Sequence, residues 1–256
     1  MKIIVSPAKS LEFEKNIPYE IYSEPAFLKC AEYLIQKLKK LSKEEIGSLM
    51  NISSKLSEIN FHRYKSWNKN LDEGTRQAIY AFDGDVYKGL NAYEFNKVEI
   101  DFAQNHLRIL SGLYGVLRPL DLIKPYRLEM GIKLKNNEGD NLYKYWQDIL
   151  TDYINNDLKE DKEKVLLNLA SKEYSKVLNS EYIDKDIKIV SPVFKEYRNN
   201  NYKTVAIYAK KARGIMAQYI IKNKINKLEE IKKFNLEGYT FREDMSIEEK
   251  LVFTRG

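Results

Sequence analysis

Residues 107–131 have the sequence LRILSGLYGVLRPLDLIKPYRLEMG, which combines turn-forming residues with cations. The turn formers include two glycines and two prolines, and the cations include two arginines and a lysine: Gly112, Gly115, Pro119, Pro125, Arg118, Arg127 and Lys124. Glycine permits close backbone approach, and proline stops a helix from continuing through the segment. The stretch therefore predicts a shaped, cationic loop whose apolar half, residues 109–117, is anchored in the core.

The arginines of this loop have two interpretations. Arg118 and Arg127 lie beside prolines, so a rigid backbone is expected to hold both guanidinium groups. Guanidinium groups held in this way bind planar anions such as phosphate or carboxylate. Alternatively, the segment is a structural crossover in which the arginines form ion pairs with Asp121 and Glu129.

A second group of cations follows residues with the pattern of a strand. Residues 204–208, TVAIY, precede Lys210, Lys211 and Arg213, and apolar residues then recur at helical spacing. The pattern predicts a strand followed by a helix that begins near Lys210. Three cations in a first helical turn oppose the helix dipole, which favours an anion bound beside them. The alternative is a solvated basic end packed against acidic neighbours.

Five motifs along the chain resemble those of a known family. They are SPAKS at 6–10, FDGDVY at 82–87, LSGLYGVLRPLDLIKPYRLEMG at 110–131, NLAS at 168–171 and YAKKARG at 208–214. Together they resemble the peroxide stress protein YaaA family over essentially the whole chain. The resemblance implies a cytoplasmic bacterial protein of the oxidative-stress response that binds DNA through a positively charged cleft. It also implies a helix-hairpin-helix element and an unusual mixed fold, and it brings no established reaction with it.

The predicted fold class is α+β, a single domain over residues 1–256 in which helices surround a mixed sheet, as the resemblance also implies. Strands are expected at 2–5, 165–169, 187–197, 202–209, 238–241 and 251–254, with an asparagine turn at 199–201. Helices are expected from Pro25 to about Lys40, over 99–110 and over 140–153. The sequence Ser42-Lys-Glu-Glu45 is a capping box that starts another helix.

Residues 42–67 are the segment in which a helix-hairpin-helix is expected. Asn51 and Ser53 lie between two helical patterns, and Lys55 begins the second. Such hairpins present backbone amides to a DNA phosphate and rely on glycines, and this chain has Asn51 and Ser53 where glycine is expected. Asn tolerates the left-handed conformation and Ser can cap a helix, so a phosphate-binding hairpin and a plain packing hairpin both fit these residues.

The composition is that of a folded protein with a mild preference for anionic partners. Lys and Arg number 43 against 37 Asp and Glu, which gives a net charge of +6. The single cysteine, Cys30, lies on an apolar helical face and is expected to pack in the core. Neither a signal peptide nor a membrane helix is predicted, so a cytoplasmic location without membrane contact is expected.

No metal or other cofactor is predicted. The two histidines, His62 and His106, are far apart in sequence and belong to no zinc-binding motif. Asp83 and Asp85 flank a glycine, a pattern that more often forms a turn. A carboxylate site for magnesium or iron is the alternative for this pair.

The leading hypothesis is a protein that binds duplex or branched DNA with little sequence specificity and supports its protection or repair, alongside DNA repair or recombination proteins. The residues expected to contact phosphates are Lys9, Asn51, Ser53, Lys55, Arg118, Arg127, Lys210, Lys211 and Arg213. A second hypothesis is a nucleic-acid or nucleotide enzyme of the glycosylase or lyase type, with Lys9 as amine nucleophile and Asp83 as its acid–base partner. A third is a stress protein that handles iron or an anionic small molecule.

Overall fold

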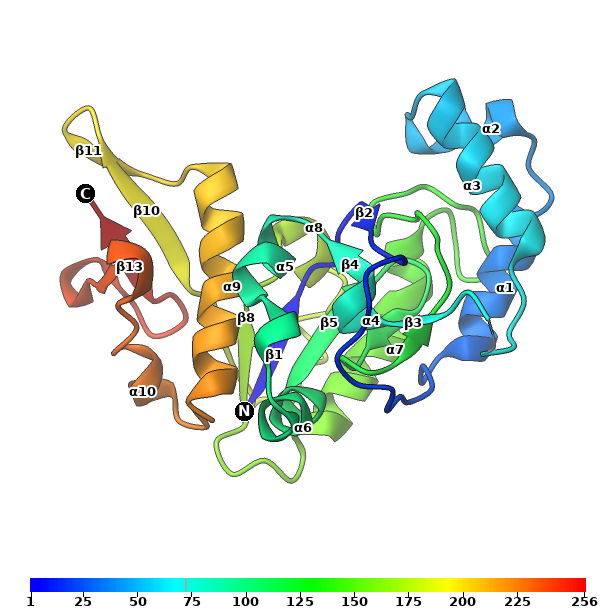
Figure 1. The fold of residues 1–256 in the computed structure, drawn as a ribbon. Helices are drawn as coiled ribbons and strands as arrows, with labels where there is room; N and C mark the ends of the chain where they lie inside the picture. Colours follow the sequence, from blue (N-terminus) through cyan, green and yellow to red (C-terminus); the bar gives the residue numbers. More distant parts are fainter. Residues whose placement is uncertain (72) are drawn as a thin grey trace.

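A five-stranded sheet lies at the centre of the computed structural model, which describes residues 1–71 and 73–256 (Figure 1). Its strand order is β6-β5-β1-β8-β9. Four strands are parallel, namely β1 (Lys2–Val5), β5 (Leu107–Ser111), β8 (Val165–Asn168) and β9 (Lys188–Val190), and β6 (Gly115–Leu117) returns antiparallel beside β5. The middle strands are short apolar runs, as parallel strands covered on both faces require.

Residues 107–117 form two strands of this sheet, so the apolar half of the predicted loop is anchored in the core as expected. A tight turn joins β5 to β6, and β7 (Leu122–Ile123) follows. Gly115 has a φ of +71°, and a Cβ at this position would lie 2.6 Å from the Trp146 ring. The glycine therefore serves a close approach between the hairpin and α7 (Leu142–Leu158), and the loop prediction is corrected to a buried hairpin for residues 107–117 only.

The helix expected over 99–110 ends early, because its last residues belong to the central sheet. α6 (Lys97–His106) begins with a capping box, in which Asn96 Oδ1 accepts from the Glu99 amide at 3.0 Å. Residues 107–109 pair with β1, so burial in the sheet outweighs the helical pattern. The Arg108 guanidinium donates to the Gln104 carbonyl at 3.1 Å and so satisfies an acceptor at the helix end.

A second sheet has four strands in the order β11-β10-β13-β12. β10 (Val193–Arg198) and β13 (Val252–Arg255) are parallel, and β11 (Asn201–Lys203) and β12 (Thr240–Phe241) pair antiparallel to them. Asn199 and Asn200 have φ values of 50° and 57°. Two successive left-handed residues are what a two-residue hairpin turn needs, so the predicted asparagine turn is confirmed.

The strand expected to reach residue 209 ends at Lys203, and α9 (Ala206–Lys222) follows it. Residues 204–208 have strand propensity, but burial of Ala209 and Ala212 on one helical face outweighs that preference. Because the helix begins at Ala206, the three cations from Lys210 to Arg213 lie in its second turn. The argument for an anion at a helix dipole therefore does not apply, since the dipole acts within the first turn.

Helices and short strands complete the fold, and the predicted α+β class is confirmed. The longer helices at one end are α1 (Leu28–Leu38), α2 (Lys43–Met50) and α3 (Ser54–Ser66), and the shorter ones are α4 (Ala78–Ala81), α5 (Asp85–Leu90), α8 (Lys172–Ser175), α10 (Leu228–Ile231), η1 (Ala92–Glu94), η2 (Leu236–Gly238) and η3 (Glu243–Met245). Two small sheets join β2 (Ser10–Leu11) to β4 (Phe82–Asp83) and β3 (Arg76–Gln77) to β7. Cys30 is half-buried against the core. Within the described ranges, no helix has the length and apolar content needed to cross a membrane.

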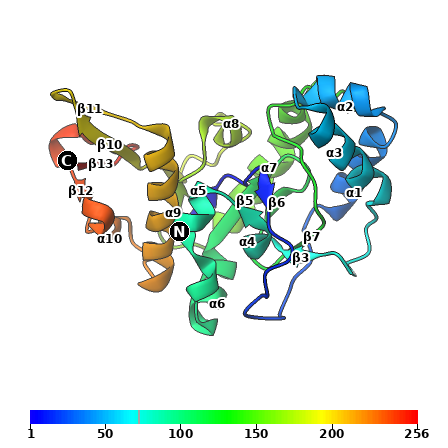
Figure 2. The ribbon, with the colours of Figure 1, turned by 45° about the horizontal axis from the view of Figure 1, so that its top comes forward.

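α9 stands between the two sheets and separates them. The hairpin of α2 and α3 lies at the end of the molecule opposite the four-stranded sheet (Figures 1 and 2). The ends of β1 and β8, with α5 and α8 beside them, lie between these two extremes (Figure 1). This arrangement places the motif at residues 6–10 and the predicted basic segment at 208–214 in the middle of the molecule.

Candidate functional site

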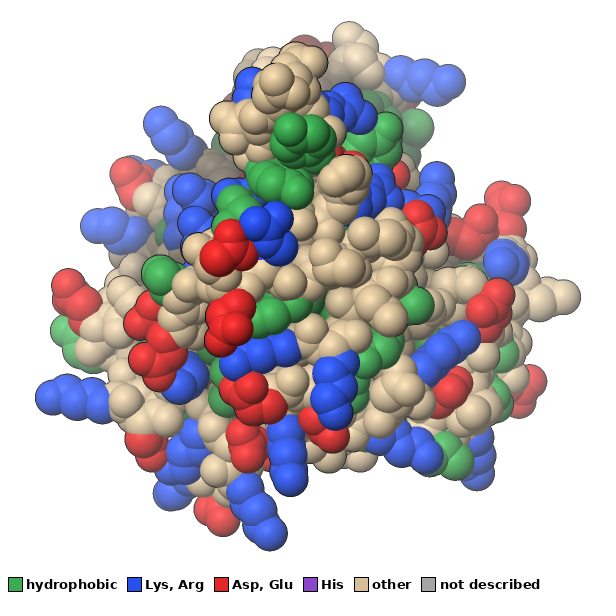
Figure 3. Space-filling model, turned by 90° about the vertical axis from the view of Figure 1, so that its left-hand side faces the viewer, with side chains coloured by type: hydrophobic (Ala, Val, Ile, Leu, Met, Phe, Trp, Pro, Cys, Tyr) green, Lys and Arg blue, Asp and Glu red, His purple; other side chains and the backbone are tan. Residues whose placement is uncertain are grey.

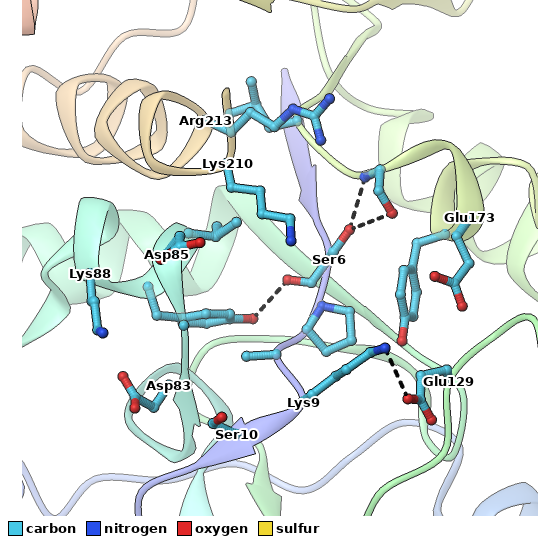
Figure 4. Close-up of a pocket in the computed structure, with 18 residues that line it drawn as sticks. Ser6, Lys9, Ser10, Asp83, Asp85, Lys88, Glu129, Glu173, Lys210 and Arg213 are labelled. Atoms are coloured by element: carbon cyan, nitrogen blue, oxygen red, sulfur yellow. Dashed lines mark hydrogen bonds and ion pairs between the residues drawn. The ribbon is translucent and has the colours of Figure 1, made fainter. Parts of the chain in front are cut away.

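A pocket of about 430 Å³ opens at the carboxyl ends of β1 and β8. β5 and β8 lie on opposite sides of β1, and in parallel sheets such a reversal of strand order leaves a crevice for a ligand. The lining comes from five parts of the chain: residues 6–10, residues 83–88, Glu129, the segment from Leu169 to Tyr174, and α9. The pocket therefore brings together four residues that the sequence singles out, namely Lys9, Asp83, Lys210 and Arg213 (Figure 4).

Ser6, the first residue after β1, connects three of these segments. Its hydroxyl accepts a hydrogen bond from the Ser171 amide at 2.9 Å and donates to Ser171 Oγ at 3.3 Å. Its carbonyl accepts from the Tyr87 hydroxyl at 3.1 Å (Figure 4). These bonds fix the ends of β1 and β8 and the position of α5 relative to one another, so the base of the pocket is held in place.

Two glycines allow α9 to approach α5 closely. A Cβ at Gly214 would lie 1.9 Å from the Val86 carbonyl oxygen, and a Cβ at Gly89 would lie 2.3 Å from the Lys211 carbonyl oxygen. No side chain fits at either position, so the two helix backbones are in direct contact. This contact fixes α9 beside the pocket, where Lys210 points toward Ser6 (Figure 4).

Arg213 lies half-buried in the wall of the pocket, on the α9 side. Burial lowers the pKa of its guanidinium, although an arginine remains charged. Among the described residues it has no hydrogen-bond or ion-pair partner. Partial burial of an unpaired charge costs free energy, which a bound anion would offset. The pocket therefore favours an anion beside Arg213.

Lys9 faces Glu129 rather than Asp83. Its Nζ lies 3.4 Å from Glu129 Oε1, whereas Asp83 lies on the other side of the Lys9 side chain and points away from it (Figure 4). Asp83 instead pairs with Ser10 through the backbone, in the ladder of β2 and β4. The expected partnership of Lys9 with Asp83 is therefore corrected to one with Glu129.

Glu129 is buried, and its two carboxylate oxygens differ in the contacts that they make. Oε1 accepts from Arg127 Nε at 3.1 Å and from Arg127 Nη2 at 2.9 Å, in addition to its contact with Lys9. Oε2 is buried without a hydrogen-bond partner in the part of the chain that the structure describes. A carboxylate oxygen normally accepts hydrogen bonds, so Glu129 retains an unmet acceptor.

The charges that line the pocket are balanced. Four side chains are cationic and four are carboxylates: Lys9, Lys88, Lys210 and Arg213 against Asp83, Asp85, Glu129 and Glu173. A groove that follows a nucleic-acid backbone has an excess of positive charge. This pocket instead combines cations, which can bind an anion, with carboxylates, which can accept hydrogen bonds from a ligand.

Arg118, Arg127 and Lys211 already hold carboxylates. Arg118 Nε donates to Asp121 Oδ1 at 3.2 Å, and burial raises the pKa of Asp121. Together with the Arg127 pair, this contact shows that the arginines of 107–131 form the structural ion pairs considered from the sequence. Lys211 pairs with Glu237 at 3.1 Å and does not line the pocket.

α2 and α3 form a helical hairpin remote from the pocket. The predicted capping box is confirmed, because Ser42 Oγ accepts from the Glu45 amide at 3.2 Å and Glu45 Oε2 accepts from the Ser42 amide at 2.7 Å. Asn51 is left-handed with a φ of 50°, and Ser53 caps α3 through a long hydrogen bond of 3.5 Å. Lys55 is exposed on the first turn of α3. Phosphate binding by this hairpin stays a prediction.

Tyr64 connects the hairpin to the pocket wall. It lies on α3, and its buried hydroxyl donates to the Arg127 carbonyl. Burial raises the pKa of this hydroxyl, which stays protonated and can donate. Because Arg127 holds Glu129, which contacts Lys9, a continuous series of contacts runs from α3 to the pocket.

Some of the residues that line the pocket lie outside the motifs identified in the sequence. Lys88 directly follows the motif FDGDVY, and Glu173 lies two positions after NLAS, so proximity to those motifs was the available signal. Glu129 was considered only as a partner for arginine. Asp83 and Asp85 do line the pocket, yet within residues 1–71 and 73–256 no group of three or more His, Cys, Asp or Glu side chains is arranged to hold a metal.

The net positive charge of the protein is not gathered on the side of the molecule that carries the four-stranded sheet. Figure 3 shows Lys and Arg interspersed with Asp and Glu over this side. Ion pairs in this sheet and its loops include Arg242 with Asp244 at 2.8 Å and Arg255 with Glu196 at 2.7 Å. This side therefore presents a mixed surface rather than a uniform one for phosphates.

Comparisons with known proteins cover the whole pocket. A family model described as "Peroxide stress protein YaaA" matches residues 1–245. A protein of Colwellia psychrerythraea named "UPF0246 protein" is 48% identical over 256 residues, which is 100% of this chain and 99% of that relative. Every segment that lines the pocket falls within both matches.

Proposed function

The chain belongs to the peroxide stress protein YaaA family, and on this premise we propose that it binds DNA during the response to peroxide stress. Phosphates of duplex or branched DNA contact Lys9, Lys210 and Arg213 at the pocket, and Asn51, Ser53 and Lys55 of the hairpin form a second contact. Backbone contacts of this kind carry little sequence information. The protein acts in the cytoplasm, alongside DNA repair or recombination proteins.

The observation that supports this proposal most directly is the half-buried Arg213, which has no hydrogen-bond or ion-pair partner among the residues that the structure describes. A guanidinium in this state gains more from a phosphate than an exposed, already paired cation does. Lys210 points into the same pocket (Figure 4), so a phosphate beside Arg213 has a second cation within the site. Lys211, one residue away on α9, is paired with Glu237 and provides a matched comparison.

DNA binding is expected to weaken by at least about a hundredfold when Lys210 and Arg213 are both replaced by glutamine, because each lost charged contact costs roughly 1.5–3 kcal/mol. The slope of log affinity against log salt is expected to fall by about 2, one for each lost phosphate contact. Fluorescence anisotropy with a labelled duplex and a branched junction, across a salt series, measures both quantities.

The control is Lys211→Gln, which removes one charge from the same helix but leaves the pocket unchanged. It is expected to bind DNA within about twofold of the wild type, as a paired surface lysine contributes little. An equal loss in this control would mean that net charge rather than the pocket governs binding. An unchanged salt slope in the double variant would remove Lys210 and Arg213 from the DNA interface.

A second candidate function is an enzyme of the lyase type, which the contact between Lys9 and Glu129 favours. The amine of Lys9 would attack the C1′ aldehyde of an abasic sugar and, with loss of water, form an imine. Before attack the ammonium must lose a proton, and Glu129 Oε1 lies 3.4 Å from it. Under this hypothesis Glu129, not Asp83, is the acid–base partner of Lys9.

Borohydride is expected to trap the protein on abasic duplex if this chemistry occurs, because hydride addition converts the imine to a stable secondary amine. The Lys9→Ala variant is expected to form no adduct, Glu129→Gln to form it much more slowly, and Asp83→Asn to resemble the wild type. Gel mobility after denaturation reports the adduct. A wild type without adduct, or an adduct that persists in Lys9→Ala, excludes Lys9 as the nucleophile.

A further inference from the structure

We propose that the pocket binds a single nucleoside monophosphate unit, with its phosphate beside Lys210 and Arg213. The unit is either a nucleotide that leaves the base stack of bound DNA or a free mononucleotide, since both present a phosphate, a sugar and a base. This inference rests on the proposed function, because it names the part of DNA that enters the pocket. Four observations lead to it, concerning size, cations, carboxylates and apolar walls.

The size of the pocket excludes a duplex and suits one nucleotide. Its volume of about 430 Å³ lies in the range of sites that enclose small organic ligands. A duplex can contact only the rim of such a pocket. Proteins that act on single bases take the nucleotide out of the stack into a pocket of this kind, at a cost of a few kcal/mol that is smallest for unpaired bases.

The cations of α9 provide the place for the phosphate. Arg213 is half-buried, and its neighbours within the described ranges offer it no hydrogen bond or ion pair. Lys210 points from the same helix toward Ser6 (Figure 4). A phosphate has two non-bridging oxygens in a DNA strand and three in a free mononucleotide, so in either case it can engage a guanidinium and an ammonium together.

The carboxylates require a ligand that also donates hydrogen bonds. Glu173, Asp85 and Glu129 line the same space, and Glu129 Oε2 is buried without a partner among the described residues. A run of backbone phosphates would be repelled by these groups. Three of the four bases carry exocyclic amino donors, from which carboxylates accept hydrogen bonds, and a free mononucleotide adds a sugar hydroxyl.

The remaining walls are apolar and suit the faces of a base. Pro7, Val86 and Leu169 line the pocket together with the rings of Tyr87 and Tyr174. Burial raises the pKa of both tyrosine hydroxyls, so the rings stay neutral. Neutral aromatic and aliphatic walls favour a planar, uncharged base over a second anionic group.

The test uses the full chain and the four deoxynucleoside 5′-monophosphates, measured by isothermal titration calorimetry. At least one monophosphate is expected to bind at least about tenfold more tightly than its nucleoside or inorganic phosphate. The nucleoside lacks the contacts of the phosphate with Lys210 and Arg213, and inorganic phosphate lacks the contacts of the base and sugar. Arg213→Gln is expected to lose at least about tenfold in affinity, whereas Lys211→Gln is expected to bind as the wild type does. Glu173→Gln is expected to weaken the monophosphate but not inorganic phosphate.

Competition separates the two sources of the nucleotide. If the unit belongs to DNA, the monophosphate displaces duplex with an unpaired nucleotide much less readily than fully paired duplex, because paired duplex contacts only the rim of the pocket. If it is a free metabolite, it displaces both DNAs equally, because both use only the cations Lys210 and Arg213. Both results support the pocket assignment and differ only in the source.

Three outcomes overturn a proposal, and they distinguish the nucleotide pocket from the DNA-binding function. If no monophosphate binds at millimolar concentration while DNA binding remains, the nucleotide pocket is wrong and the DNA-binding function stands. If monophosphates bind but no DNA does at low salt, the DNA-binding function is wrong and the pocket serves a free nucleotide. Equal loss of monophosphate binding in Arg213→Gln and Lys211→Gln also overturns the pocket assignment.

Discussion

Replacing Gly214 by alanine is expected to lower the free energy of unfolding by about 3 kcal/mol. The new Cβ would lie 1.9 Å from the Val86 carbonyl oxygen and 2.8 Å from the Leu90 amide nitrogen. Both atoms belong to the backbone of α5, so no side-chain rotation can relieve the overlap. The helices must separate, which also moves Lys210 and Arg213 away from Ser6. Urea unfolding followed by circular dichroism measures the change.

The Gly47→Ala variant is the matched control, because Gly47 also lies within a helix. The nearest atom to a Cβ there is Ser57 Oγ at 3.4 Å, which a rotamer change can accommodate. Alanine is a better helix former than glycine, so a gain of roughly 0.5–1 kcal/mol is expected. If Gly214→Ala unfolds at the same urea concentration as the wild type, the close contact of α5 and α9 does not position the pocket.

Replacing Asp157 by asparagine is expected to cost about 3–5 kcal/mol of stability, because it leaves the buried guanidinium of Arg108 without its counter-ion. Arg108 Nε and Nη2 donate to the two oxygens of Asp157 at 2.8 Å each, and Arg108 is 4% exposed. Burial alone would lower the pKa of Arg108, but the hydrogen bonds to Asp157 outweigh it and the pKa is raised. Lys2, 3.3 Å from the same carboxylate, would add repulsion in the variant.

The control for this pair is Asp244→Asn, since Arg242 holds Asp244 through two bonds of 2.8 Å at the surface. An exposed pair is worth at most about 1 kcal/mol, so only a small change is expected. The double variant Arg108→Met with Asp157→Leu removes both charges and is expected to be more stable than Asp157→Asn alone. Similar losses for Asp157→Asn and Asp244→Asn would show that burial of the Arg108 pair carries no special cost.

Features set by neighbouring residues were predictable from the sequence. The capping box at Ser42, the left-handed Asn51 and the asparagine turn before β11 depend on residues within four positions of one another. Local hydrogen bonds decide such features, and the same bonds form wherever the sequence recurs. The convergence of Lys9, Lys210 and Arg213 was not visible in the residues alone, although the motifs marked each segment.

Features set by distant parts of the chain were mispredicted. The sequence of residues 107–110 fits a helical pattern as well as a strand pattern. These residues form a strand because they pair with β1, which lies about 100 positions away in the sequence. Residues 204–208 favour a strand locally, but α9 packs on α5 instead. The partner of Lys9 is 120 positions away, so no local pattern could choose Glu129 over Asp83.

The pocket has a consequence for the order in which the protein folds. Ser6 and Ser171, which join the ends of β1 and β8, are 165 positions apart, and α9 comes later still in the chain. Contacts between such distant positions form slowly, because the entropy of closing a long loop is lost before the contacts can stabilise the chain. During synthesis, residues 6–10 leave the ribosome long before α9 does. The pocket therefore cannot form until Lys210 and Arg213, which line it together with residues 6–10, have been made. The hairpin of α2 and α3, whose contacts are local, is an early product of folding, and the pocket is a late one.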